Sequence, residues 1–523
     1  MLKSVLTTTA IMAGLVLVQP APSSAEQFTW AASGDAATLD PHALSEGFTL
    51  SFLGNVYDGL VRRGKDLSLE PALATAWEQV DPTTWRFELR QDVTFHGGEA
   101  FTADDVLFSY ERASADTSGI GNIISSIAAV NVIDDHTIEL VTKAPDPILP
   151  DSITNWLIMS RSWAEANNTV TTSTEAQNFA TNNTNGTGAF KVTYREADVR
   201  TELAVNDGWW DETEHNVTEA TFRPINSALT RVGALLSGEV DLIIPVPVQN
   251  IDQIDNSDGY GVLQGPELRT IFLGMDQYRD TLIGSDAESN PFLDQKVRQA
   301  VYQAIDVDAI IDKVMRGAAT PAGLLIGPGI KGFDPAMNDR LPFDPDQSKA
   351  LLAEAGYPDG FSTAMHCPND RYVNDEAICQ AVVGMLAKIG VQVDLETMTK
   401  TIFFDLLKEG GSGFYLLGWT SGTYDAHHIM RFLLHTPGTP AKLGSWNFAG
   451  YSNAEIDALT IEIGSEMDPD ARAAKVARVH QIMRDETAYV PLHQQSLAWG
   501  VKDNVSLVQR ADNFFNLRWV TVN

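Results

Sequence analysis

The chain of 523 residues has little positive charge and almost no long hydrophobic runs. Its 36 Lys and Arg are set against 69 Asp and Glu, which gives a formal net charge of −33. Nucleic-acid binding is disfavoured, because phosphate contacts require clustered Lys and Arg and no basic patch with interleaved aromatics occurs. The one extended apolar run, Val5 to Val18, is shorter than the ~20 residues that a membrane-spanning helix needs. We therefore expect a soluble mature protein.

Cysteine is also scarce. The chain has two, Cys367 and Cys379, and no C-x-x-C spacing accompanies them. In an oxidising compartment such a pair is typical of a disulfide that closes a short loop, worth roughly 3 kcal/mol in the chain-entropy model. A pair of metal ligands is the alternative, and the missing C-x-x-C motif speaks against it.

The usual signatures of catalysis are missing as well. No G-x-S-x-G, H-E-x-x-H or Walker A motif occurs. Gly327, Gly329 and Gly332 do fit G-x-G-x-x-G, but a proline lies inside the motif and no helix follows, so we expect an irregular surface loop. Acidic residues are too abundant for any pair to be singled out for acid/base chemistry. The sequence predicts no enzyme and no cofactor.

The N-terminus has the layout of a cleavable export signal. Lys3 precedes the apolar run, and Ser23 and Ala25 occupy the small-residue positions of a cleavage site. We expect residues 1–25 to be removed, which makes Glu26 the mature N-terminus. No cysteine follows the signal to carry a lipid anchor, and this predicts a location in a Gram-negative periplasm.

The pattern of the first half predicts a strand, a turn and a helix in that order. Trp85, Phe87 and Leu89 alternate with charged residues, as in a strand with one buried face. Two glycines interrupt the pattern, and Thr102 with Asp105 then offers an acidic form of the capping box at a helix start. The chain is long enough for two or three hydrophobic cores.

The second half is rich in helix signals. Helical spacing runs over 294–316 with a restart at Asp306, and a second helix begins after Asp344 and ends at Gly356. A third helix over about 375–390 is followed by the period-two residues 391–395. Helix followed by strand predicts the α/β class.

The assembled string from Glu70 to Ala113, EPALATAWEQVDPTTWRFELRQDVTFHGGEAFTADDVLFSYERA, resembles the signature of a known family. That family is the peptide/nickel/opine class, family 5, of the extracytoplasmic solute-binding proteins of bacterial ABC importers. Its members capture solutes and do no chemistry on them. Further landmarks follow in the family's order, and the resemblance covers essentially the whole mature chain: GTGAFKV from Gly186, VRQAVYQAID from Val297, LLAEAGYPDGF from Leu351, LLGW ending at Trp419 and YSNAEIDAL from Tyr451.

The resemblance implies a two-lobed α/β periplasmic binding protein of type II, similar to cluster C, with an extra subdomain on lobe one. We expect lobe one to span residues 26–268 and the C-terminal return 497–523, and lobe two to span 269–496. Glu267–Met275 and Val490–Val501 are the expected crossing strands of the hinge. Ligand is expected to bind in the cleft as the lobes close.

The resemblance also implies a ligand site in lobe two. Arg371, beside Tyr372, matches the arginine with which dipeptide-binding members hold a ligand carboxylate, since a guanidinium offers parallel donors to two oxygens. A surface arginine next to Asp370 is the alternative. Trp419 could stack on a ligand or belong to the core.

One position departs from the peptide-binding members of the family. There, an aspartate three residues after the tryptophan pairs with the ligand's α-amino group, whereas this chain has Gly422. Either Asp425 replaces the missing acid, or the ligand lacks a primary amine, as opines do.

Family position places three further residues near the cleft from lobe one: His42, Tyr57 and Gly188. Glycine at such a turn lets backbone N–H groups approach a ligand closely. The local density of His427, His428 and His435 makes a metal or metal-chelate ligand an alternative, although such histidines are more often solvated or bonded to a backbone group.

The sequence thus predicts a monomeric periplasmic substrate-binding protein that delivers a peptide-like or opine-like solute to an inner-membrane permease and its ATPases. A metal-chelate or oligosaccharide binder of the same family and a chemoreceptor-coupled sensor are the alternatives. A secreted hydrolase would need a nucleophile and a base that the sequence does not display.

Overall fold

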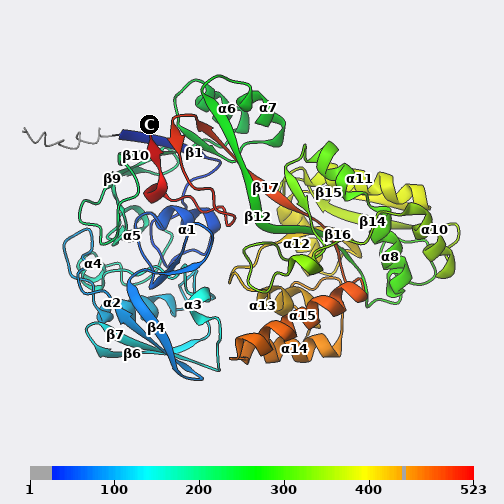
Figure 1. Ribbon diagram of the computed structural model, residues 1–523, viewed down its shortest axis with the longest axis horizontal. Coiled ribbons are helices and arrows are strands. Elements are labelled where there is room, and N and C mark those ends of the chain that lie inside the picture. The colour runs from blue at the N-terminus through cyan, green and yellow to red at the C-terminus, as the bar shows by residue number, and fades with distance from the viewer. Residues whose placement is uncertain (1–25, 439–442) are drawn as a thin grey trace, which may run out of the picture.

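The computed structural model describes residues 26–438 and 443–523, so the predicted signal, residues 1–25, lies outside the described part of the chain. Figure 1 shows two bodies joined by two long strands. We call the body that contains the first strand lobe one and the other lobe two. No helix within the described ranges is long and apolar enough to cross a membrane.

One mixed sheet runs through both lobes. Its strand order is β15-β14-β16-β12-β17-β11-β1-β10-β9-β8, and β13 pairs with β17 off this path. The joining strands are β12 (Tyr260–Met275) and β17 (Val490–Lys502), which pair antiparallel and cross between the lobes (Figure 1). This confirms the predicted hinge of crossing strands, although β12 begins seven residues before the predicted Glu267.

The pairing of the two crossing strands is interrupted at two points, between Pro266 and Thr270 and between Ile271 and Phe272. Pro266 pairs with Ser496 and Thr270 pairs with Gln494, so residues 267–269 stand opposite a single residue of β17. Such an excess of residues is a β-bulge, which bends a strand and changes the direction of its side chains. The amide of Leu268 in this bulge donates to the carbonyl of Ala511, 2.9 Å away. The predicted lobe limits, 268/269 and 496/497, fall inside β12 and β17 and stay predictions.

Lobe one combines half of the large sheet with a separate four-stranded sheet of order β4-β5-β7-β6. The second sheet has a hydrophobic core of its own, to which Phe87 and Leu89 contribute, and it forms the subdomain at the lower left of Figure 1. The elements of lobe one are β1 (Glu26–Ala32), α1 (Gly47–Leu53), β2 (Val61–Arg63), β3 (Leu69–Pro71), β4 (Ala74–Asp81), β5 (Thr84–Leu89), α2 (Ala103–Ala113), β6 (Ile127–Asp134), β7 (Thr137–Thr142), α3 (Leu149–Ser152), α4 (Arg161–Ala166), α5 (Phe179–Asn182), β8 (Phe190–Glu196), β9 (Arg200–Val205), β10 (Val217–Pro224), α6 (Ala228–Leu236), β11 (Leu242–Ile244), α7 (Ile251–Asp255), β18 (Val505–Ser506) and β19 (Thr521–Val522).

The string that carried the family resemblance belongs to this lobe. Asp105 accepts from the amide of Thr102 (2.9 Å) at the start of α2, as the capping box predicts. The imidazole of His96 lies 3.0 Å from the carbonyl of Gly188, and the amide of Gly97 donates to Asn185 (2.7 Å). These two hydrogen bonds fix the turn at residues 95–98 against the turn at residues 186–190, so both turns stabilise the fold of lobe one.

Lobe two packs helices against the other half of the sheet. Its first long helix is broken as predicted, because Asp306 caps a new start after α8, and the continuation over 310–314 is π-helical. The elements are α8 (Gln295–Ala304), α9 (Val307–Ala309), β13 (Ala319–Pro321), α10 (Pro345–Glu354), β14 (Phe361–Pro368), α11 (Asp375–Leu386), β15 (Val391–Met398), α12 (Lys400–Lys408), β16 (Phe414–Trp419), α13 (His427–Ile429), α14 (Ala454–Ser465) and α15 (Pro469–Asp485).

The lobes also touch away from the crossing strands. Leu67, at the β2–β3 turn of lobe one, lies in a hydrophobic cluster formed by lobe two. The guanidinium of Arg63 lies 4.2 Å from the ring centroid of Tyr424, whose hydroxyl donates to Asp512 (2.9 Å). A β-carbon on Gly329 would come within 3.2 Å of Leu67, so the glycine-rich loop over 327–332 faces lobe one. This loop is therefore part of the contact between the lobes, where we expected only an irregular surface loop.

Candidate functional site

The loop that carries Arg371 connects β14 to α11 and is fixed at several points. The carboxylate of Asp375 accepts from the amides of Arg371 (2.9 Å) and Tyr372 (3.0 Å). The Tyr372 hydroxyl donates to the carbonyl at residue 418 (3.2 Å). A disulfide joins Cys367 in β14 to Cys379 in α11, as the sequence predicts, and so ties the two ends of the loop together.

The Arg371 side chain is exposed, and its guanidinium has no hydrogen bond or ion pair with any residue that the structure describes. It lies 5.2 Å from the ring centroid of Tyr372, and the guanidinium of Arg269 lies 5.8 Å from the same ring. Desolvation, and then the positive charge of Arg269, lower the pKa of Arg371. Two cations therefore stand close together beside one aromatic ring.

Two carboxylates, Glu267 and Asp370, act electrostatically on Arg371, and of the two arginines Arg269 is the one that contacts Glu267. Glu267 accepts from the Nε of Arg269 at 3.3 Å and also from the side-chain Nε2 of Gln495. Both Glu267 and Arg269 project from the bulge of β12, which places them at the hinge. Sequence reasoning missed Arg269, although it lies inside the predicted crossing strand. This arrangement can bind an anionic group, because a guanidinium without an ion pair is a strong donor to carboxylate oxygens.

Trp419 ends β16 and lies among aromatic side chains. Its indole is 5.2 Å from Trp446 and 6.0 Å from Phe432 between ring centroids. Its Nε1 donates to Nδ1 of His428, 3.1 Å away. Trp419 is partly exposed, so it is neither a free stacking platform nor a fully buried core residue. Gly422 is exposed and lies beside His428.

Asp425 has a different environment from the one that a ligand-binding acid needs. It is completely buried, and Nη1 and Nη2 of Arg472 each donate to one of its oxygens at 2.8 Å. The amide of His427 donates to the same carboxylate, also at 2.8 Å. In this conformation the carboxylate offers no open oxygen to a ligand amine, and its position is that of a buried structural ion pair.

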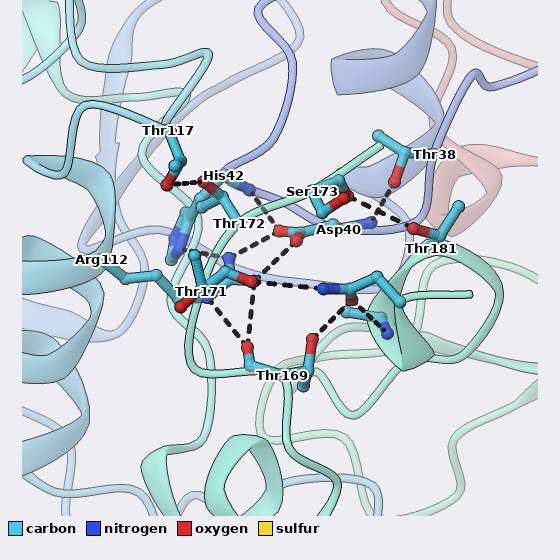
Figure 2. A network of polar contacts seen from close by, with 12 residues as sticks. Thr38, Asp40, His42, Arg112, Thr117, Thr169, Thr171, Thr172, Ser173 and Thr181 are labelled. Carbon is cyan, nitrogen blue, oxygen red and sulfur yellow. Dashed lines mark hydrogen bonds and ion pairs between the residues drawn. The ribbon is translucent and has the colours of Figure 1, made fainter. Parts of the chain in front are cut away.

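His42 also lies in the interior, as Figure 2 shows for the polar network of lobe one. Its Nε2 is 2.7 Å from the carbonyl of Leu157, and its Nδ1 is 3.2 Å from Arg112. Arg112 in turn makes two bonds of 2.6 Å to Asp40 and also donates to the carbonyl of Thr169 (Figure 2). Desolvation, together with the Arg112 charge, lowers the pKa of His42 to about 4. With both ring nitrogens engaged and no exposed surface, His42 has nothing to offer a ligand in this conformation.

Tyr57 and Gly188 are buried in the same lobe. Tyr57 is 1% exposed, and burial raises the pKa of its hydroxyl. A β-carbon on Gly188 would lie 2.6 Å from the backbone of Val56, and the Gly188 amide already donates to the Val56 carbonyl. Glycine is needed here for the close approach of two backbone segments, and a role of Gly188 at the ligand stays a prediction.

The histidines of lobe two do not assemble a metal centre. No group of three or more His, Cys, Asp or Glu suited to a metal ion occurs within the described ranges. His427 bonds to the carbonyl of Thr460 (2.8 Å), and Nδ1 of His435 lies 3.0 Å from the carbonyl of Thr436. Backbone bonding was the alternative that the sequence left open.

Two cavities lie outside these groups. One, of about 370 Å³, lies in lobe one between the β2–β3 hairpin and the C-terminal segment, and it is lined by residues such as Arg62 and Trp519. The other, of about 300 Å³, lies in lobe two and is lined by residues such as Tyr302 and Arg484. Neither is lined by a residue predicted to bind ligand.

The fold and the hinge define a class of protein, and comparison with known proteins agrees with it. The model of the bacterial extracellular solute-binding proteins, family 5, matches residues 68–440. The chain belongs to this family.

Three relatives illustrate its range. The chain is 26% identical to the glutathione-binding protein GsiB of Pectobacterium atrosepticum over 80% of its own length and 79% of that protein. It is also 26% identical to heme-binding protein A of Haemophilus influenzae, over 90% and 87% of the two chains. The structure of HbpA2 from Haemophilus parasuis matches with a TM-score of 0.81 at 23% identity, covering 95% of this chain and 100% of that one. This last likeness confirms the two-lobed fold.

Proposed function

We propose that this protein is the periplasmic substrate-binding component of an ABC importer. It captures a small polar solute, peptide-like or opine-like, between its lobes and delivers it to an inner-membrane permease and the ATPases of that permease. Family membership and a hinge made of β12 and β17 support capture by lobe closure. The solute leaves the protein unchanged in this proposal, so the protein is not an enzyme.

The observation that carries the proposal is the pair of guanidiniums at the hinge. Arg371 is exposed without an ion-pair partner in the described ranges, and Arg269 beside it is bonded to Glu267. A ligand carboxylate would relieve the repulsion between the two cations and gain charge-assisted hydrogen bonds. Tyr372 supplies an aromatic face beside both guanidiniums. The relatives named for glutathione and heme fit this chemistry, since both compounds carry carboxylates.

We also propose that the protein is exported by its N-terminal signal and acts as a monomer. N-terminal sequencing of protein from the periplasmic fraction is expected to begin at Glu26. Light scattering on the protein as it elutes from a size-exclusion column is expected to give the mass of one chain. An uncleaved N-terminus in the cytoplasmic fraction would contradict the proposed location.

The solute can be identified from the compound that remains bound to the purified protein. Protein purified without denaturation is expected to release one compound with at least one carboxylate on unfolding, and mass spectrometry identifies it. The same compound, added back to the emptied protein, is expected to raise the melting temperature, because a ligand that binds only the folded state stabilises it. Conversion of the compound on incubation with pure protein would contradict the proposal.

Substitution tests the role of Arg371. Arg371→Ala is expected to weaken binding of the released compound by about 2–5 kcal/mol, the usual cost of removing one partner of a desolvated charge pair. The melting temperature without ligand is expected to stay nearly unchanged, because the side chain is exposed. Arg200→Ala, at an exposed arginine on β9 of lobe one, is the matched control. Equal affinity in the two variants would remove Arg371 from the site.

A further inference from the structure

His428 presents one defined hydrogen-bond donor. An indole N–H can only donate, so the 3.1 Å contact from Trp419 Nε1 requires a lone pair on Nδ1 of His428. Desolvation, and then the charges of Arg431 and His427, lower the pKa of His428 to about 4. The ring is therefore neutral at pH 7, and its only hydrogen on nitrogen is at Nε2. Trp419 thus fixes the tautomer.

This donor opens toward the position of Gly422. A β-carbon placed on Gly422 would lie 3.5 Å from Nε2 of His428, and Gly422 itself is exposed. Nε2 makes no hydrogen bond with any residue in 26–438 or 443–523. The absence of a side chain at residue 422 leaves room for a ligand group at hydrogen-bond distance from Nε2.

The charges around this point favour an acceptor on the ligand. The carboxylate of Asp425, which lies in the same loop, is already paired with Arg472. Arg431 lies close enough to depress the pKa of His428, and no ion pair of its guanidinium occurs in the described part of the chain. Asp146 of lobe one, which Arg431 also influences, is largely buried and accepts from the amide of Ile148 (3.1 Å). A neutral N–H donor beside an unpaired cation suits an oxygen and repels an ammonium group.

The same tautomer argues against metal binding at this nitrogen. Coordination through Nε2 needs its lone pair, and the hydrogen would then sit on Nδ1, facing the indole N–H of Trp419. Two donors would meet at 3.1 Å with no acceptor between them.

We propose that Nε2–H of His428 hydrogen-bonds a carboxylate or carbonyl oxygen of the solute in the space above Gly422, and that His428 thereby determines specificity against ligands with a free α-ammonium group at this end. The inference rests on the proposed function and adds the chemistry of the ligand's second end. The first end is the carboxylate that Arg371 faces.

Two probes that differ only at one end test the proposal: the dipeptide alanyl-glutamate and its N-acetyl form, each titrated by calorimetry into the full mature protein. Wild type is expected to bind the N-acetyl form at least tenfold more tightly. His428→Phe, which keeps a ring but removes the donor, is expected to lose this preference. Gly422→Asp places an acid beside Nε2 and is expected to reverse the preference toward the free amine. Preference of wild type for the free amine, or an unchanged preference in both variants, would overturn the inference.

A spectroscopic measurement separates a recognition role from a structural one. In protein labelled with ¹⁵N-histidine, His428 is expected to show the Nε2–H tautomer at pH 7, and its Nε2–H resonance is expected to shift on addition of N-acetyl-alanyl-glutamate. An Nδ1–H tautomer or an unmoved resonance in the bound state would refute the inference and leave the proposed function standing. Failure of wild type to bind either probe would instead contradict a peptide-like solute and the inference together.

Discussion

Removal of one partner of the ion pair between Arg472 and Asp425 is expected to destabilise lobe two strongly. The two side chains are 8% and 0% exposed, and the guanidinium also donates to the carbonyl of Ile463 (3.1 Å). Arg472→Ala removes all three bonds and leaves a fully buried carboxylate with only the amide of His427 as a partner. Breaking a buried pair in this way costs about 3–5 kcal/mol, because the remaining charge is uncompensated.

The helix that carries Arg472 supplies a matched control. Arg478, also on α15, makes two bonds to Glu455 (2.7 and 3.0 Å), but both of these side chains are 51% exposed. A pair screened by water contributes about 0–1 kcal/mol, so Arg478→Ala is expected to have little effect. Urea unfolding followed by far-UV circular dichroism gives the difference between the variants. Adding Asp425→Leu to Arg472→Leu is expected to recover much of the loss. Equal destabilisation by Arg472→Ala and Arg478→Ala would refute the reasoning.

Two further predictions concern the disulfide and a buried histidine. Reduction of Cys367–Cys379, or its replacement by two alanines, is expected to cost about 3 kcal/mol, since it frees a loop of about 13 residues in the unfolded chain; a melting temperature unaffected by reductant would contradict this. The same change is expected to weaken ligand binding, because the freed loop carries Arg371. His480 is buried, and desolvation lowers its pKa from 6.5 to about 4. Between pH 6.5 and pH 4 this histidine is therefore protonated in the unfolded chain but neutral in the folded protein. The stability that it provides is present above pH 6.5 and is lost as the pH falls toward 4, up to about 3 kcal/mol in all. In His480→Leu the urea unfolding midpoint is expected to fall less steeply with decreasing pH than in wild type. A decline as steep as that of wild type would contradict the assignment.

Local patterns in the sequence predicted local structure well. Alternation predicted the strand that buries Phe87 and Leu89, and the cap at Asp344 is present, with its carboxylate accepting from the amide of Gln347 (2.8 Å). Such features depend on residues a few positions apart, so spacing alone reveals them. The family landmarks added the arrangement of the lobes.

The candidate site was harder, because long-range partners decide what each side chain can do. The sequence around Asp425 shows no partner for its carboxylate, because its partner Arg472 lies 47 residues away. His42 meets Arg112 across 70 residues. Arg269 is a candidate ligand-binding residue because the bulge places its guanidinium near Tyr372. No pattern in the sequence predicts these long-range contacts, whereas the spacing of the two cysteines did predict the loop that they close.

The bulge in β12 has a consequence for the order in which the protein is assembled. Where the two crossing strands lose register, the amide of Leu268 bonds to Ala511 rather than to β17. Arg510, next to it, donates to the carbonyl of Arg63 at the base of the hairpin that reaches lobe two. The last residues of the chain thus complete a joint whose other parts were made much earlier. Phe515, Leu517 and Val520, which follow Ala511, are buried in the core of lobe one. The joint between the lobes and the core of lobe one can therefore be completed only after this last segment of the chain has been synthesised.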